Sequence, residues 1–127
     1  MSLQLSGKTA IITGAAGGLG RAFALGFASR GANVVVADMN EAGSAETVAL
    51  IEASGGKAIA VKTNVTDKAS CEAVADAAVS TYGSLDVLVN NAAIYATIER
   101  AWPKWHKSYT VMPHTYMRTW PGSSGEK

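Results

Sequence analysis

A run of glycines follows the first apolar segment of the chain. Gly14, Gly18 and Gly20 lie in the stretch 13–20, after a β-branched run and before a segment with helical spacing. In a parallel α/β sheet such a turn brings the phosphates of a ligand onto the amino end of the helix. Gly14 lets the chain leave the strand tightly, Gly18 lacks a Cβ that would block a diphosphate, and Gly20 permits close helix–sheet packing. The alternative is a plain strand–helix turn in which glycine serves geometry alone.

Two other residues of this turn, Ala15 and Ala16, have small side chains where a ligand would approach. Ala15 and Ala16 keep the turn open to a ligand, because neither side chain extends beyond one methyl group. We therefore predict a phosphate cradle built from backbone groups rather than from charged side chains. The candidate contacts in the turn are Gly14, Ala16, Gly18, Leu19 and Gly20.

An acidic residue ends the second apolar strand. Asp38 follows Gly20 at close to the spacing of about 20 residues at which an acidic side chain accepts hydrogen bonds from an adenosine ribose. Its carboxylate would repel a 2′-phosphate, and no Arg or Lys lies inside the turn or next to Asp38 in the chain to offset that repulsion. These residues predict NAD, in preference to NADP, as the cofactor. The alternative is that Asp38 only caps a helix that begins near Asn40.

Two further segments follow predicted strands. Asn64 and Val65 come after the third strand, and the stretch 90–93 comes after the fourth. Ligands of open parallel sheets bind at the carboxyl ends of the strands, so we expect these residues to contact the cofactor. The alternative is that the paired asparagines hold backbone groups between strands. The candidate contacts outside the turn are Asp38, Asn64, Val65, Asn91, Ala92 and Ala93.

The elements that must position these residues are visible in the apolar pattern of residues 8–90. Short β-branched runs alternate with longer segments of helical spacing, which predicts four strands and three helices in strict alternation. The uninterrupted run 34–36 of valines indicates a strand covered by helices on both faces. We predict an α/β fold with a doubly wound, Rossmann-like parallel sheet, truncated to about four strands over residues 9–13, 33–38, 58–62 and 87–89.

Each predicted helix has a start or stop signal and an apolar stripe. The first ends at Gly31, the second runs over about 41–54, and the third begins after Thr66 or Asp67 and ends at Gly83. The stripe predicted to be buried on the first helix contains Leu19, Ala22, Phe23, Gly26 and Phe27. On the third helix the predicted stripe contains Cys71, Val74, Ala75, Ala78, Val79 and Tyr82.

At these residues the sequence resembles the short-chain dehydrogenase/reductase family. The family signature Thr-Gly-x-x-x-Gly-x-Gly is matched by Thr13 and the three turn glycines, and the acidic end of the second strand is present as well. The family's Asn-Asn-Ala-Gly stretch is matched at 90–93, with Ala93 in place of its glycine. Asn64 stands where the family often has Asp. The motifs fall in the family's order over residues 5–98.

The resemblance implies an NAD-dependent oxidoreductase that moves a hydride between a nicotinamide and an alcohol or ketone. It also implies that the glycine turn binds the diphosphate, that Val65 approaches the adenine ring and that Asn91 approaches the adenine ribose. The family's chemistry uses a Tyr-x-x-x-Lys pair with an upstream Ser and an Asn, and the lysine lowers the pKa of the tyrosine hydroxyl. No tyrosine of this chain has a lysine four residues later. We therefore assign no catalytic residue and expect binding without turnover from this chain alone.

A second hypothesis belongs to a different functional class. The chain could be a noncatalytic nucleotide-binding or protein-interaction module from a truncated gene. In that hypothesis the fourth strand is an unpaired edge that recruits another chain or a second copy, which would make a homo-oligomer. A stable monomer would instead indicate that the C-terminal tail covers this edge.

The composition changes near Glu99. All three Trp, all three Pro and both His lie in residues 99–127, so we divide the chain into a dinucleotide-binding half-domain, 1–98, and a divergent Trp/Pro-rich tail, 99–127. Three interpretations of the tail stay open: an aromatic helix that binds a partner or membrane surface, packing over the sheet edge, or disorder. A frameshift product is a further hypothesis. The proposed helical stripe is Trp102, Trp105, Tyr109 and Met112.

Charge and cysteine content exclude several classes of partner. A formal net charge of +1 offers no basic field for nucleic acid, and no apolar run is long enough to span a membrane. The chain shows no signal peptide, and its one cysteine, Cys71, cannot form an internal disulfide, so we expect a cytoplasmic protein. His106 and His114 match no metal-site spacing, and we predict no bound metal.

Overall fold

The computed structural model describes residues 5–91 and 109–111. Strands and helices alternate along the chain, and the predicted strands and helices are confirmed to within about one residue at their ends. The elements are β1 (Thr9–Thr13), α1 (Gly18–Ser29), β2 (Asn33–Asp38), α2 (Glu41–Ala53), β3 (Lys57–Lys62), α3 (Lys68–Tyr82), β4 (Val87–Val89) and β5 (Tyr109–Val111).

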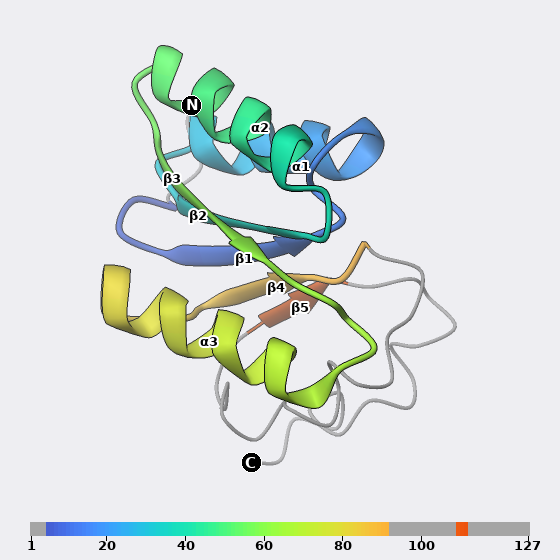
Figure 1. The fold of residues 1–127 in the computed structure, drawn as a ribbon. Helices are drawn as coiled ribbons and strands as arrows, with labels where there is room; N and C mark the ends of the chain where they lie inside the picture. The colour runs from blue at the N-terminus through green and yellow to red at the C-terminus, as the bar shows by residue number, and fades with distance from the viewer. Residues whose placement is uncertain (1–4, 92–108, 112–127) are drawn as a thin grey trace.

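The strands form one parallel sheet in the order β3-β2-β1-β4-β5 (Figure 1). β1 lies at its centre, where Ile11 is paired with Val35 of β2 on one side and Leu88 of β4 on the other. Because β1, β2, β3 and β4 are parallel, each connection between them crosses over one face of the sheet, and α1, α2 and α3 supply these three crossovers. The predicted doubly wound, Rossmann-like fold is confirmed.

The edge of the sheet at β4 differs from the prediction. β4 is not an unpaired edge, because it pairs in parallel with β5, and Leu88 lies opposite Thr110. Tyr109 therefore belongs to a strand, and the interpretation in which it shares a helical stripe is wrong. A three-residue strand has too few positions for an alternating pattern, so the sequence held no periodic signal for it. The other residues of that stripe, Trp102, Trp105 and Met112, lie outside the described residues.

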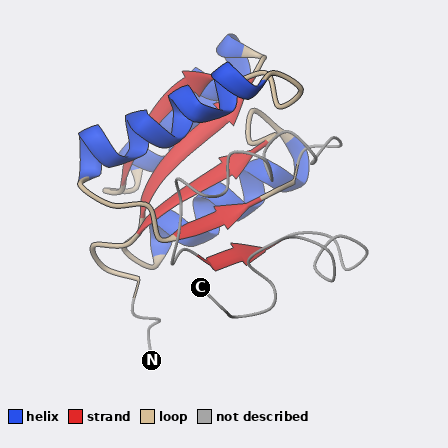
Figure 2. Ribbon diagram, turned by 90° about the horizontal axis from the view of Figure 1, so that it is seen from below, coloured by secondary structure: helices blue, strands red, loops and turns tan. Residues whose placement is uncertain are grey.

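Helices cover both faces of the sheet, as the valine run predicted (Figures 1 and 2). α1 and α2 lie together on one face, and α3 lies on the other. Side chains that alternate along β1 and β2 enter the two layers in turn: Ile11 and Val35 pack toward α3, whereas Ile12 and Val34 pack toward α1 and α2. No helix in the described part of the chain is both long and apolar enough to cross a membrane.

The buried face of α1 is rotated from the predicted one. The helix buries Gly20, Ala24 and Ala28, whereas Leu19 is 63% exposed, so the predicted stripe is wrong in register. Small residues at spacings of four let the helix approach the strands closely, while Phe23 and Phe27 pack at its flanks and are partly buried. The positions of the larger apolar side chains therefore predicted the wrong face of α1 as the buried one.

The predicted stripe of α3 is largely confirmed. Cys71, Val74, Ala75 and Ala78 are buried, and Tyr82 packs against the same core. Val79 is the exception, since it is 48% exposed. The helix begins at the N-cap Asp67, whose carboxylate accepts a hydrogen bond from the Ser70 N–H at 3.3 Å, and ends at Gly83 in the left-handed conformation, with φ of 86°.

Candidate functional site

The predicted site residues converge on the carboxyl edge of the sheet. The glycine turn follows β1, Asp38 ends β2, Asn64 and Val65 follow β3, and Asn91 follows β4. The direction of winding reverses between β1 and β4, because the chain proceeds from β1 outward to β3 and then returns to the other side of β1. In open parallel sheets the crevice at such a reversal is where ligands bind.

Two glycines of the turn have left-handed backbone conformations. Gly14 has φ of 68° and Gly18 has φ of 55°, a region in which a side chain would be strained. A Cβ placed on Gly18 would meet nothing within 4 Å, so the space above it is open to a ligand. The N-cap of α1 is Gly17, which has no side chain with which to cap the helix. The amino end of α1 thus presents backbone N–H groups, the arrangement that binds phosphate.

Gly20 serves the packing of α1 on the sheet. A Cβ at this position would overlap the carbonyl oxygen of Gly14 and would lie 2.8 Å from the amide nitrogen of the Asn91 side chain. The helix can therefore start this close to the end of β1 only with glycine here. This contact agrees with the close helix–sheet packing expected of the last glycine in the turn.

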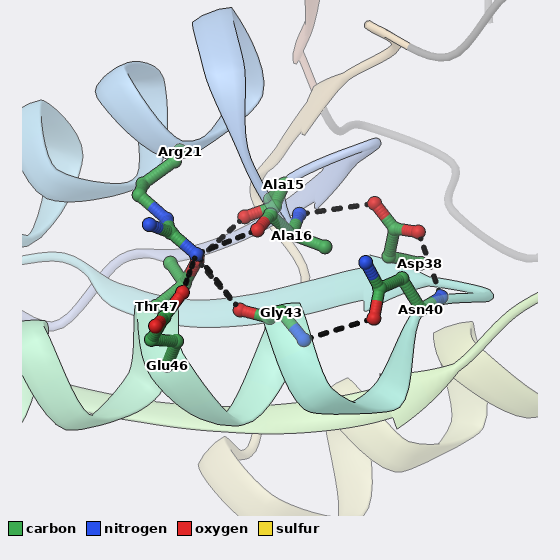
Figure 3. A network of polar contacts seen from close by, with 8 residues as sticks. All are labelled: Ala15, Ala16, Arg21, Asp38, Asn40, Gly43, Glu46 and Thr47. Carbon is green, nitrogen blue, oxygen red and sulfur yellow. Dashed lines mark hydrogen bonds and ion pairs between the residues drawn. The ribbon is translucent and has the colours of Figure 1, made fainter.

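The carboxylate of Asp38 faces the glycine turn (Figure 3). Its Oδ2 accepts a hydrogen bond from the Ala16 N–H at 3.0 Å, and its Oδ1 accepts one from the Asn40 N–H at 2.9 Å. The helix cap is Asn40 itself, whose side chain accepts from the Gly43 N–H at 2.9 Å, so the alternative that Asp38 caps α2 is wrong. A carboxylate has about four acceptor positions, and ribose hydroxyls could use those that remain.

A cavity of about 120 Å³ opens beside Asp38. Its walls come from the ends of β1, β2 and β3, and it includes three residues that the sequence analysis did not select, Ala37, Met39 and Thr63. Met39 is a large apolar side chain directly after the acidic residue, and its exposed fraction of 54% is visible only in the structure. The lining residues are Gly14, Ala37, Asp38, Met39, Thr63, Asn64 and Val65.

The asparagines after β3 and β4 form hydrogen bonds with backbone groups and with threonine hydroxyls. Asn64 Oδ1 accepts hydrogen bonds from the N–H and hydroxyl of Thr66, at 3.0 and 2.6 Å. Asn91 donates its side-chain amide to the Gly14 carbonyl at 3.4 Å, and the buried Asn90 accepts from the Thr13 hydroxyl at 3.3 Å. These contacts join the ends of β1 and β4. The approach of Asn91 to an adenine ribose stays a prediction, and Ala92 and Ala93 lie outside the described residues.

Arg21 and Thr47 are polar contacts of the turn that the sequence analysis missed (Figure 3). The Arg21 guanidinium donates to the Ala16 carbonyl at 2.7 Å, and the Thr47 hydroxyl donates to the Ala15 carbonyl at 2.8 Å. Arg21 lies in α1 and Thr47 in α2, and the two side chains are hydrogen-bonded to each other at 2.8 Å. No short motif signals this network, because it depends on how α2 packs against the turn.

A basic residue lies nearer to Asp38 than the sequence order suggested. Lys62 is its partner across the β2–β3 pairing. The Lys62 ammonium is 3.8 Å from a carboxylate oxygen of Glu41 in the first turn of α2, so its positive charge is partly compensated. Both side chains are well exposed, which makes this a weak ion pair.

The described tyrosine near the core is a poor acid–base group. Burial, with a smaller contribution from the charge of Glu52, raises the pKa of the Tyr82 hydroxyl above its ordinary value of 10.0. A general base works best when its pKa lies near the operating pH. Tyr82 therefore stays protonated at neutral pH and cannot replace an activated tyrosine.

Comparison with known proteins identifies the family. The family model described as short chain dehydrogenase matches residues 8–119. The chain belongs to the short chain dehydrogenase family. The match continues past residue 98, where the recognisable motifs end. Among curated relatives, the 7alpha-hydroxysteroid dehydrogenase of Escherichia coli K12 is 45% identical over 91 residues, and the galactitol 2-dehydrogenase of Agrobacterium fabrum is 46% identical over 93 residues.

The similarity covers most of this chain but a smaller share of its relatives. The aligned region is 72% of this chain and 36% of the Escherichia coli enzyme, and 73% of this chain and 35% of the galactitol 2-dehydrogenase. A crystal structure of a short chain dehydrogenase from Burkholderia phymatum in complex with NAD is 31% identical, with a TM-score of 0.78. It matches 87% of this chain, which covers 50% of that structure.

Proposed function

We propose that this chain binds NAD at the carboxyl edge of its sheet, as the dinucleotide-binding part of an oxidoreductase. The observation that carries the proposal is the amino end of α1, which has open space above Gly18 and a carboxylate, Asp38, hydrogen-bonded to the same turn. The NAD complex of the Burkholderia phymatum relative gives further support. When bound, NAD supplies a nicotinamide that accepts or donates a hydride, and the family's reaction is between an alcohol and a ketone.

In this proposal the diphosphate, the adenosine ribose and the adenine ring of the dinucleotide would each contact a different part of the site. The backbone N–H groups of the turn 14–20 would hold the diphosphate, since anions bind favourably at helix amino ends. Asp38 would accept hydrogen bonds from the ribose hydroxyls, and the cavity that it lines supports this role. The adenine ring would enter that cavity, where Met39 and Val65 offer apolar surface.

The same site favours NAD over NADP in this proposal. A 2′-phosphate would be brought against the Asp38 carboxylate, which two backbone N–H groups hold in place. Like charges at such short range repel strongly when the site is partly shielded from water. Lys62 is the described cation nearest in the sheet register, and its ion pair with Glu41 limits how much of that repulsion it can offset.

The proposal includes the absence of turnover by this chain alone. The tyrosines of the sequence are followed four residues later by Asp86, Glu99, Pro113 and Trp120, and none by lysine. Without a nearby cation to lower its pKa from the ordinary value of about 10, a tyrosine transfers protons poorly at neutral pH. We therefore propose coenzyme binding without alcohol or ketone conversion. The pairing of β4 with β5 removes the observation that favoured an interaction module recruited through an open β4 edge.

Calorimetric titration of the purified chain with NAD and, separately, NADP tests the proposal. The expected result is one saturable site with tighter binding of NAD. An assay of NADH formation with secondary alcohols should stay at background in the same preparation. Absence of saturation with both dinucleotides would overturn the binding assignment, tighter binding of NADP would overturn the role of Asp38, and steady turnover would overturn the proposed inactivity.

A further inference from the structure

Two consecutive carbonyl groups of the glycine turn are drawn toward α2. The Ala15 carbonyl accepts from the Thr47 hydroxyl at 2.8 Å. The Ala16 carbonyl accepts from the Arg21 guanidinium at 2.7 Å, and the same nitrogen of Arg21 also lies 3.2 Å from the Gly43 carbonyl. Figure 3 shows both carbonyls and these donors grouped between α1 and α2. Side chains of α1 and α2 therefore hold both of these carbonyl groups in place.

The orientation of these carbonyls determines where the backbone N–H groups point. In a planar trans peptide the C=O and the following N–H project in opposite directions. The peptide that joins Ala15 to Ala16 has its carbonyl on Thr47 and its N–H on Asp38. The next peptide has its carbonyl on Arg21, so the N–H of Gly17 is turned away from α2, at the amino end of α1.

Close packing reinforces the same arrangement. A Cβ on Gly43 would lie 2.7 Å from the Ala16 carbonyl oxygen and 2.9 Å from the Ala16 side chain, so the first turn of α2 touches the glycine turn directly. Thr47 lies one helical turn later and is fully buried. The glycine turn therefore cannot shift toward α2, and its carbonyls cannot rotate outward without losing two charge-assisted or buried hydrogen bonds.

The arrangement matters for an anionic ligand. Carbonyl oxygens carry partial negative charge, and an outward rotation would place them against a diphosphate in place of N–H groups. Arg21 holds the Ala16 oxygen away from that position and adds a positive charge behind the turn. Its ion pair with Glu46, at 2.8 Å, lies on the solvent side, where Glu46 is largely exposed.

We propose that Arg21 and Thr47 are positioning residues for the diphosphate of the dinucleotide. They act through the carbonyls of Ala15 and Ala16 and need not touch the ligand. This inference rests on the proposed function. It makes a separate claim, because the loss of either side chain should weaken the phosphate part of binding more than the adenosine part, which depends on Asp38 and the adjacent cavity.

Nuclear magnetic resonance titrations with adenosine and with ADP test this claim. The measured quantity is the ratio of the adenosine Kd to the ADP Kd, which isolates the contribution of the phosphates. We expect Arg21→Met to lower this ratio about tenfold, the effect of losing one hydrogen bond to a charged group. Thr47→Val should lower it about threefold, and Arg21→Lys should recover part of the loss because an ammonium can still reach one carbonyl.

Matched controls separate positioning from general effects of charge or folding. Arg30→Met removes the same charge at the opposite end of α1, and Thr81→Val makes the same change at an exposed position of α3; both should leave the ratio unchanged. Thermal unfolding of each variant identifies any that fail to fold. If Arg21→Met does not fold, the ratios measured for Thr47→Val and Arg21→Lys test the positioning role.

The possible outcomes distinguish this inference from the proposed function. Wild-type protein that binds neither ADP nor NAD would overturn the proposed function. Wild-type protein that binds ADP, with an unchanged ratio in the folded Arg21 and Thr47 variants, would overturn the positioning role alone. An equal loss of adenosine and ADP affinity would also overturn it, since that result indicates only a structural contribution.

Discussion

Asp38 accepts a hydrogen bond at 3.0 Å from the backbone N–H of Ala16, and this contact joins the end of β2 to the turn after β1. The residue predicted to select the coenzyme thus also holds the phosphate cradle beside it. Its second carboxylate oxygen accepts from the Asn40 N–H, so the start of α2 is tied to the same side chain. Substitution of Asp38 should affect selectivity without removing both backbone contacts, provided that an oxygen acceptor remains.

Asp38→Asn should reduce the preference for NAD. The amide keeps one oxygen for a backbone N–H, but it removes the negative charge that repels a 2′-phosphate and that strengthens hydrogen bonds to ribose hydroxyls. We expect NAD affinity to fall about tenfold and NADP affinity to rise. Calorimetry with both dinucleotides measures the change. Asp76→Asn, on α3 at the opposite face of the sheet, is the control and should alter neither affinity. Unchanged selectivity in the Asp38 variant would contradict the ribose assignment.

Two alanine substitutions in α1 should have opposite effects on stability. Gly20→Ala forces a methyl group against the Gly14 carbonyl and should lower the free energy of unfolding by about 1–3 kcal/mol. Gly26→Ala meets no atom within 4 Å and should raise it by up to about 1 kcal/mol, because alanine favours the helix. Denaturant unfolding of both variants measures the difference. Equal destabilisation by the two would show that the close approach at Gly20 is not the cause.

Stability should fall at alkaline pH through Cys71. Burial, with smaller contributions from the charges of Asp67 and Glu72, raises the pKa of its thiol from 9.0 to about 11. Between these values the unfolded chain loses the thiol proton while the native state keeps it, so the free energy of unfolding decreases as pH rises through this window. Below about pH 9 the thiol keeps its proton in both states, so the contribution of Cys71 to the free energy of unfolding is fully present.

The measurement for Cys71 compares slopes rather than absolute stabilities. Denaturant unfolding of wild type and Cys71→Ala at about pH 8 and about pH 10 should show a smaller pH-dependent loss in the variant. The compared quantity is the change in the free energy of unfolding with pH. The cavity that alanine leaves affects both pH values equally, and the tyrosines and lysines titrate in both proteins, so neither effect alters the difference between the two slopes. Identical slopes in the two proteins would refute the raised pKa.

Most of the fold was predictable because its signals are local. The run 34–36 of valines indicated a strand buried on both faces, and Gly31 and Gly83 marked helix ends. The buried face of α1 was not predictable from apolar size, because its closest approach to the sheet is made by Gly20, Ala24 and Ala28. β5 is three residues long and lies far along the chain from its partner, so only the tertiary pairing identifies it.

Some residues of the candidate site were likewise predictable from the sequence, and others were not. The glycine turn and Asp38 were predictable, since short spacings and position at strand ends identify them. Arg21 and Thr47 were not, because their role depends on the packing of α2 against the turn, and an arginine in the first turns of a helix is otherwise an ordinary surface residue. Met39 was missed for a related reason: its place beside the cavity depends on the ends of three strands coming together.

An amide-resolved nuclear magnetic resonance titration of the wild-type chain with NAD tests the central claim most directly. The account predicts saturable shifts, with one dissociation constant, at the amides of the turn 14–20 and at Asp38 and Val65. A second cavity of about 270 Å³ lies at the opposite edge of the sheet, lined in part by Gly31 and Lys57, and serves as an internal comparison. Shifts confined to that edge, or no saturable shifts at all, would contradict the claim that the glycine turn binds the dinucleotide.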